Sequence, residues 1–123
     1  MKLGTLIDPK FQQALLSLMR KEIPAMASFK LKTIQKKLGE ELKKFDEVRK
    51  EYLEKFAEKD EAGKAIIEKD AYKLSEENQK LFNEAMDELG NLEVDIGSIK
   101  VHELGAISIS ALDLVVLDGL VVQ

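Results

Sequence analysis

The feature that most constrains this fold is a stretch of about 30 residues, from Ala27 to Ala57, that has no proline and is rich in Leu, Lys and Glu, which all favour helix. Its apolar residues recur with helical spacing. Leu31, Leu38, Phe45 and Tyr52 share one heptad position, flanked by Ile34, Leu42, Val48 and Phe56. We therefore predict one long helix, about 45 Å in length at 1.5 Å per residue. The rest of a 123-residue chain cannot cover such a helix from end to end, so we expect part of it to project or to pair with another helix.

A shorter helix should precede the long one. Asp8 can cap a helix start, and Pro9 suits the first helical position. The apolar residues that follow share one face, and Pro24 should stop this helix near residues 21 and 22. The long helix could then start either after a Ser28 cap or at Pro24 itself.

Beyond the long helix, the segment from Glu58 to Leu74 breaks the helical pattern around Gly63 and predicts a turn with a short hairpin or an ordered loop. Ser75 then resembles a helix cap, and acidic residues follow it in the first turn. The resulting third helix should run antiparallel to the long helix. It should end at Gly90-Asn91, residues that suit left-handed backbone angles.

The C-terminal third changes to a period of two, which is typical of strands. The alternating apolar residues are Leu92, Val94 and Ile96, then Ile99 and Val101, with a break at Gly97-Ser98. One or two short strands are predicted here, followed by a short helix from Ala111 to Leu117 that Ser110 caps.

The predicted fold class is therefore α+β, mainly α, in a single domain spanning residues 1–123. It has an N-terminal helix, a long central helix, an antiparallel third helix, short β-strands and a short C-terminal helix. The predicted core packs the long-helix residues Leu31, Ile34, Leu38, Leu42 and Phe45 against Phe82, Met86 and Leu89 and against Leu15 and Leu18.

Composition excludes several classes of site. The chain has no Cys and a single His, His102, which excludes thiol nucleophiles, disulfides, Cys-based metal sites and two-His metal sites. It has no Gly-x-Ser-x-Gly elbow, glycine-rich phosphate loop or His-Glu-x-x-His motif. The acidic turn at Asp60 has Ala62 and Lys64 where a calcium loop needs oxygen ligands. We therefore predict no catalytic residue, no cofactor and no metal.

The chain also lacks sequence signals for membrane insertion or export. No apolar run approaches the roughly 20 residues of a membrane helix, and the start of the chain lacks the features of a signal peptide. We expect a protein that is neither secreted nor inserted in a membrane.

Charge divides along the chain. Residues 1–50 hold 12 Lys and Arg against 6 Asp and Glu, a net charge of +6, whereas residues 51–123 hold 7 against 17, a net charge of −10. The candidate partner-facing residues lie in two heptad rows of the long helix and are Lys36, Lys37, Lys43, Lys44 and Lys50. Glu40 lies between these rows and should pair with Lys36 or Lys44. Because acids interrupt the rows and no Trp is present to stack on bases, the pattern favours a solvated or protein-facing surface over nucleic-acid binding.

The tail from Leu112 to Val122 is almost entirely apolar. Its candidate core or interface residues are Leu112, Leu114, Val115, Leu117 and Leu120. The apolar stripe of the long helix indicates core first and a coiled-coil seam second. Together, the apolar stripe of the long helix and the apolar tail have more apolar surface than a chain of this length can bury. Exposed apolar patches usually mark interfaces. We therefore expect a homo-oligomer or a place in a larger assembly, in which the Lys-rich face of one subunit meets acidic segments, Glu76-Glu77 or Asp87-Glu88, of another.

The ordered series of segments resembles a group of small tailed-bacteriophage proteins of unknown function. The segments that carry the resemblance are Leu15-Leu16, Ile23-Pro24, the Lys/Glu helix from Lys36 to Lys55, the turn from Glu58 to Gly63, Phe82-Asn83-Glu84, Glu93-Val94-Asp95-Ile96 and Ser110-Ala111-Leu112-Asp113-Leu114. Together they cover most of the chain. The apolar C-terminal tail departs from the acidic ending that the pattern leads us to expect.

This resemblance implies a function exerted by binding. The leading hypothesis is a non-enzymatic bacteriophage protein that acts by protein–protein contact in the virion or in its assembly. The alternative is an early phage protein that binds and inhibits or redirects a host factor, including a defence factor. Either role implies a location in the host cytoplasm, and the first also implies incorporation in the virion.

Overall fold

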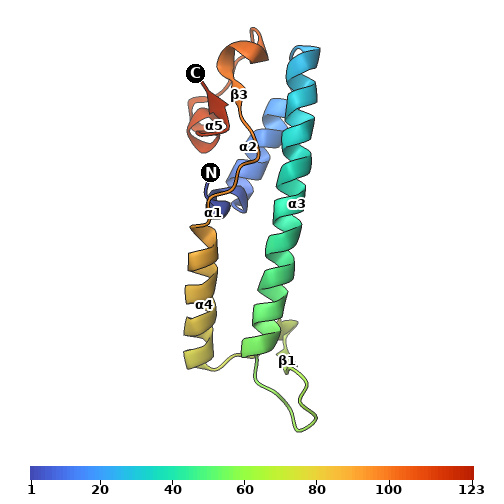
Figure 1. Cartoon of the computed structure of the whole chain (residues 1–123), viewed down its shortest axis with the longest axis vertical. Coiled ribbons are helices and arrows are strands. Elements are labelled where there is room, and N and C mark those ends of the chain that lie inside the picture. The colour runs from blue at the N-terminus through green and yellow to red at the C-terminus, as the bar shows by residue number, and fades with distance from the viewer.

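A computed structural model describes all 123 residues, which form an elongated, mainly helical α+β structure (Figure 1). The elements in chain order are α1 (Leu3–Leu6), α2 (Pro9–Met19), α3 (Ala25–Phe56), β1 (Ile67–Glu68), β2 (Ala71–Tyr72), α4 (Glu76–Gly90), β3 (Ile99–Lys100), the 3₁₀ helix η1 (Val101–Leu104), α5 (Ala111–Val116) and β4 (Val121–Val122). The predicted fold class is confirmed. The four-residue helix α1 was not predicted, because nothing in its short sequence carries a helical period.

The two N-terminal helix starts follow from local sequence signals. The Asp8 carboxylate accepts a hydrogen bond from the backbone N–H of Lys10 (2.9 Å), with Pro9 in the first helical position, as predicted. Helix α3 begins directly after Pro24, so Ser28 lies in its first turn and is not the cap. The backbone N–H of Ser28 donates to the carbonyl of Pro24 (3.0 Å), which leaves the proposed cap position already helical. Of the two predicted starts, the one at Pro24 is correct.

Helices α3 and α4 run antiparallel (Figure 1), as predicted. The segment between them contains the predicted hairpin, in which β1 and β2 pair with Ile67 opposite Tyr72. Lys69 and Asp70 form its turn with positive φ angles, 51° and 64°, as tight two-residue hairpin turns require. Helix α4 begins at a Ser75 cap, whose hydroxyl accepts from the N–H of Asn78 (3.2 Å).

The end of α4 differs from the prediction in its backbone geometry. Asn91 follows the helix with φ −87° and ψ −4°, in the right-handed region, so the predicted left-handed ending is wrong. Gly90 serves a close approach instead. A Cβ on Gly4 would lie only 3.1 Å from the carbonyl oxygen of Gly90, so the two glycines allow α1 and α4 to meet.

The hydrophobic core lies at one end of the molecule. Its main residues are Leu3, Leu6, Phe11, Leu15, Leu18, Leu31, Ile34, Leu38, Ile96, Ile99, Leu104, Leu117 and Leu120. The predicted packing of the first half of α3 against Leu15 and Leu18 is confirmed. The predicted residues Leu42, Phe45 and Leu89 are partly buried and pack against this cluster. Phe82 is buried but lies outside the cluster, and Met86 is only partly buried, so these two are not part of the main core. The core is completed instead by the C-terminal third of the chain.

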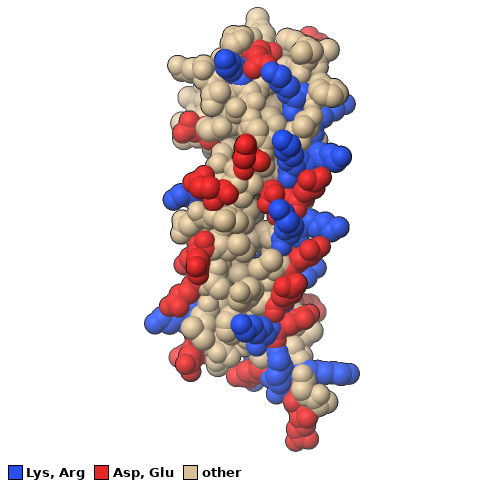
Figure 2. All heavy atoms as spheres, viewed as in Figure 1, with Lys and Arg blue, Asp and Glu red and all other residues tan.

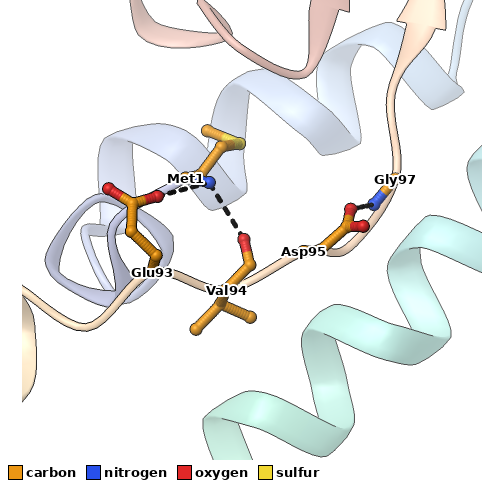
Figure 3. Close-up of polar contacts among 5 residues, drawn as sticks. All are labelled: Met1, Glu93, Val94, Asp95 and Gly97. Carbon is orange, nitrogen blue, oxygen red and sulfur yellow. Dashed lines mark hydrogen bonds and ion pairs between the residues drawn. The ribbon is translucent and has the colours of Figure 1, made fainter.

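The alternating segment from Leu92 to Ile96 is extended, and it pairs with the N-terminus (Figure 3). The N-terminal ammonium group donates to the carbonyl of Val94 (2.9 Å) and lies 3.3 Å from the Glu93 carboxylate. The N–H of Val94 donates back to the carbonyl of Met1 (2.8 Å), and the N–H of Leu3 donates to the carbonyl of Leu92 (2.9 Å). A bend follows at Gly97, where φ is +95° and Asp95 accepts the backbone N–H (2.9 Å).

The second predicted strand is shorter than the pattern indicated. Only Ile99 and Lys100 form β3, which pairs in parallel with β4. Val101 belongs to η1, so its assignment to a strand is wrong. The physical reason is Glu103, whose carboxylate accepts the backbone N–H of Lys100 (3.1 Å) and thereby stabilises a helical turn. The predicted C-terminal helix is confirmed as α5, with the Ser110 hydroxyl accepting from the N–H of Asp113 (3.1 Å).

Candidate protein-binding surface

The second half of α3 and the whole of α4 form a two-helix hairpin with little covering. Beyond Leu38, no residue of α3 is buried, and Phe82 is the only buried residue of α4. The large apolar side chains of this half of α3 are all only partly buried, and they are Leu42, Phe45, Val48, Tyr52, Leu53 and Phe56. Two helices alone cannot enclose a core, so the apolar stripe that the sequence predicted as core is only partly covered here.

An apolar cleft lies on one side of this hairpin, and we name it the hairpin cleft. It has a volume of 470 Å³ and is lined by Val48, Tyr52, Ala85, Met86, Glu88, Leu89, Asn91 and Leu92. Six of these eight residues are apolar. Leu81 lies one turn before Ala85 on the same helix face and is itself exposed, so the apolar surface extends along α4.

The opposite side of the hairpin is less apolar, because residues of the N-terminal segment lie beside it. A second cleft there is lined by Phe45 and Met86 together with Thr5 and Ile7, which belong to α1 and its end. Most of its lining is not apolar. The hairpin cleft is therefore the more apolar of the two sides.

The five candidate lysines of α3 are all exposed, and they divide into two groups. Lys37 and Lys44 precede Val48 by eleven and four residues, which places both on the helix face of Val48. Lys44 borders the hairpin cleft, and Lys37 lies about two turns farther along α3. Lys36, Lys43 and Lys50 follow a row turned away from the cleft. The predicted pairing of Glu40 with Lys36 or Lys44 is not found, because Lys44 pairs with Glu41 instead (2.8 Å) and Lys36 forms no ion pair. Lys50 pairs with Asp46 (3.2 Å).

The apolar tail divides into core and surface. Leu117 and Leu120 are fully buried in the main core. Leu112 and Val115, on α5, are 79% and 74% exposed, and Leu114 is 42% exposed. The tail is therefore neither all core nor all interface, because Val116 at the end of α5 and the apolar residues after it pack against the core, whereas Leu112 and Val115 face outward.

Two further exposed apolar residues were missed by the sequence analysis. Met26 and Phe29, in the first turns of α3, are each 74% exposed. The signal was present in the sequence, because both residues fall outside the heptad rows that carry the apolar stripe. Leu92 was assigned to a strand, and its exposure at the end of the hairpin cleft was not anticipated.

The titratable groups with shifted pKa values lie at contacts between elements. His102 is exposed on η1, and no group of three or more His, Asp or Glu side chains is placed to hold a metal ion. The hydrogen bond from Lys30, with that from the backbone N–H of Lys100, lowers the pKa of Glu103. Desolvation raises the pKa of Tyr72, assisted by the hydrogen bond that its hydroxyl donates to Glu54 (3.2 Å). Both perturbed groups serve contacts between neighbouring elements.

None of the helices combines the length and apolar character that a membrane span requires. Comparison with protein-family models, with curated proteins and with solved structures finds no match.

Proposed function

We propose that this chain is a non-enzymatic protein that acts by contact with other protein chains. The observation that carries the proposal is the distribution of apolar surface. The hairpin cleft and the α5 residues Leu112 and Val115 expose apolar side chains on an otherwise highly charged chain. Exposed apolar surfaces of this kind, bordered by polar residues, commonly mark sites of protein–protein interaction.

The proposed setting is the particle of a tailed bacteriophage or its assembly. The order of segments from Leu15 to Leu114, which resembles a group of small phage proteins, supports this setting. The exposed apolar surface supports a structural partner, since assembly contacts commonly bury such surface. The alternative, an early protein that binds a host factor, would use the same surfaces and differs in when and where the partner is met.

The test is to delete the coding sequence from the phage genome that carries it and to purify particles from the infected culture. We expect the protein in wild-type particles, or unassembled particle components in the deletion. A complementing Val115→Arg or Ala85→Arg protein should fail where Lys36→Ala succeeds, because Lys36 lies outside both apolar surfaces.

Normal numbers of particles that form without the protein and never contain it would contradict the proposed setting. If expression of the protein alone then slows host growth, the early-protein alternative takes its place.

A further inference from the structure

We infer that the hairpin cleft is covered by a second copy of this chain, in a two-fold dimer whose four long helical segments form a bundle. The inference rests on the proposed function, in that it names the partner of one of the two proposed contact surfaces. Two antiparallel helices with an apolar stripe and no third layer form half of a four-helix bundle, the common way to enclose such stripes.

The surface area of the chain is the first argument. Its accessible surface is 8597 Å², whereas a folded monomer of 13.9 kDa exposes about 6,700 Å² on average. The excess is about 1,900 Å², and a standard interface buries about 800 Å² on each partner. The chain thus exposes more than enough additional surface to supply one side of a stable dimer.

The charges along the hairpin are the second argument, and they favour a second copy over an unrelated partner. Helix α3 holds 9 Lys and Arg against 6 Asp and Glu, a net charge of +3. Helix α4 holds 1 Lys against 5 Asp and Glu, a net charge of −4. Figure 2 shows charges of both signs along α3, mainly acidic ones along α4, and uncharged surface between them. Each chain therefore carries both halves of a complementary pair.

The border of the hairpin cleft decides how the two copies are arranged. On α4 the bordering charged residues are acidic, namely Glu77, Glu84 and Glu88, which recur at seven and four residues. On α3 the border has both signs, with Lys44 and Lys55 beside Glu41 and Glu51. Placing α4 on the partner's α4 would oppose acid to acid, at a cost in binding. The favoured arrangement therefore places α3 of each copy on α4 of the other.

This arrangement fixes the direction of the symmetry axis. A two-fold axis parallel to the helices places each α3 over the partner's α4, whereas an axis across the helices would stack like on like. A rotation about this parallel axis does not shift residues along the helices. Each residue of the partner therefore lies at the same height along the bundle as its equivalent in the first copy. The end of α3 lies beside the start of α4, since Asn78 donates to the carbonyl of Phe56 (2.9 Å). Lys44 accordingly faces the partner's helix near the level of Glu88.

The first test measures the mass in solution by sedimentation over a range of micromolar concentrations. We expect the full chain to approach twice 13.9 kDa. Ala85→Arg places a long charged side chain in the cleft and should leave a folded monomer. Val115→Arg on α5 is the matched control and should still dimerise. A monomer at every concentration, or a dimer lost in Val115→Arg and kept in Ala85→Arg, would overturn the inference.

The second test reverses charges on the exposed border, where neither change disturbs the core. Glu88→Lys should weaken the dimer about tenfold, because it sets a lysine against Lys44. Adding Lys44→Glu should restore most of the lost affinity, and higher salt should reduce both effects. A double variant as weak as Glu88→Lys would overturn the proposed arrangement of α3 on α4.

The dimer and the proposed function fail separately. If the protein is a monomer but is still required for particle assembly, the dimer is ruled out and the proposed function stands. If the protein dimerises as expected but is absent from particles and is not needed for their formation, the dimer stands and the proposed phage setting is ruled out.

Discussion

Leu38 and Leu112 show how differently one residue type contributes to this molecule. Leu38 is 4% exposed against the main core, whereas Leu112 stands on the outer face of α5. We predict that Leu38→Ala lowers the free energy of unfolding by about 2–5 kcal/mol, because it removes buried methyl groups and leaves a cavity. Leu112→Ala, the matched control, should change it by less than about 0.5 kcal/mol. Urea unfolding of both variants measures the difference, and equal effects would place Leu38 at the surface.

Glu103 joins η1 to α3 through Lys30, with which it forms an ion pair. The hydrogen bond from Lys30 lowers the folded-state pKa of Glu103, so the unfolded chain binds this proton more tightly. The stabilisation is therefore complete above the unfolded-state pKa and is lost as the pH falls through the lowered folded-state pKa.

We predict that Glu103→Gln lowers the melting temperature near neutral pH and that this difference disappears on acidification. The effect should be small and should decrease with salt, because both side chains reach solvent. Melting curves of the two proteins between about pH 7 and about pH 3 test this, spanning the usual carboxyl range. A difference that stays constant through that range would contradict the assigned role of the ion pair.

At the scale of the element, α4 depends on its cap because only one of its residues is buried. The Ser75 hydroxyl satisfies the free N–H of Asn78 at the helix start. We predict that Ser75→Ala lowers the free energy of unfolding by about 1 kcal/mol. Ser75→Asp keeps an acceptor and adds a favourable charge at the helix start, so it should retain the stability. Chemical unfolding of the three proteins compares them, and an unchanged Ser75→Ala would show that the cap is dispensable.

The elements that could be predicted from the sequence are those that local residues specify. Asp8, Ser75 and Ser110 each cap their own helix, and the heptad rows of α3 need no distant partner. The local β1–β2 hairpin could be predicted too, but the pairing of β3 with β4 could not, since it joins distant segments. The alternation from Leu92 to Ile96 was recognised, but its pairing with Met1 and Leu3 depends on how the whole chain folds.

The candidate site was predictable to a similar extent. Val48 and Tyr52 were recognised as part of an apolar stripe, and Lys37 and Lys44 as partner-facing residues. Which lysine row borders the cleft depends on the side on which α4 packs, and that is a tertiary property. For the same reason the sequence could not show that Leu117 turns inward while Val115 turns outward, only two residues apart.

At the scale of the whole molecule, the chain has one closed half and one open half. The core end joins the N-terminal helices, the first half of α3 and the C-terminal segment into one cluster. The hairpin end extends beyond it as two helices (Figure 1). A helix of 32 residues, about 48 Å in length, is longer than the core end can cover. The open half thus follows directly from the length of α3.

The central claim, that the hairpin is a contact surface covered by another copy, is tested most directly by hydrogen exchange at increasing protein concentration. Amides in residues 42–56 and 76–90 should become more protected as the dimer forms, because covering the cleft suppresses local opening. Amides of α5 should exchange at a rate independent of concentration. Hairpin protection that is the same at every concentration, or concentration-dependent protection confined to α5, would contradict the claim.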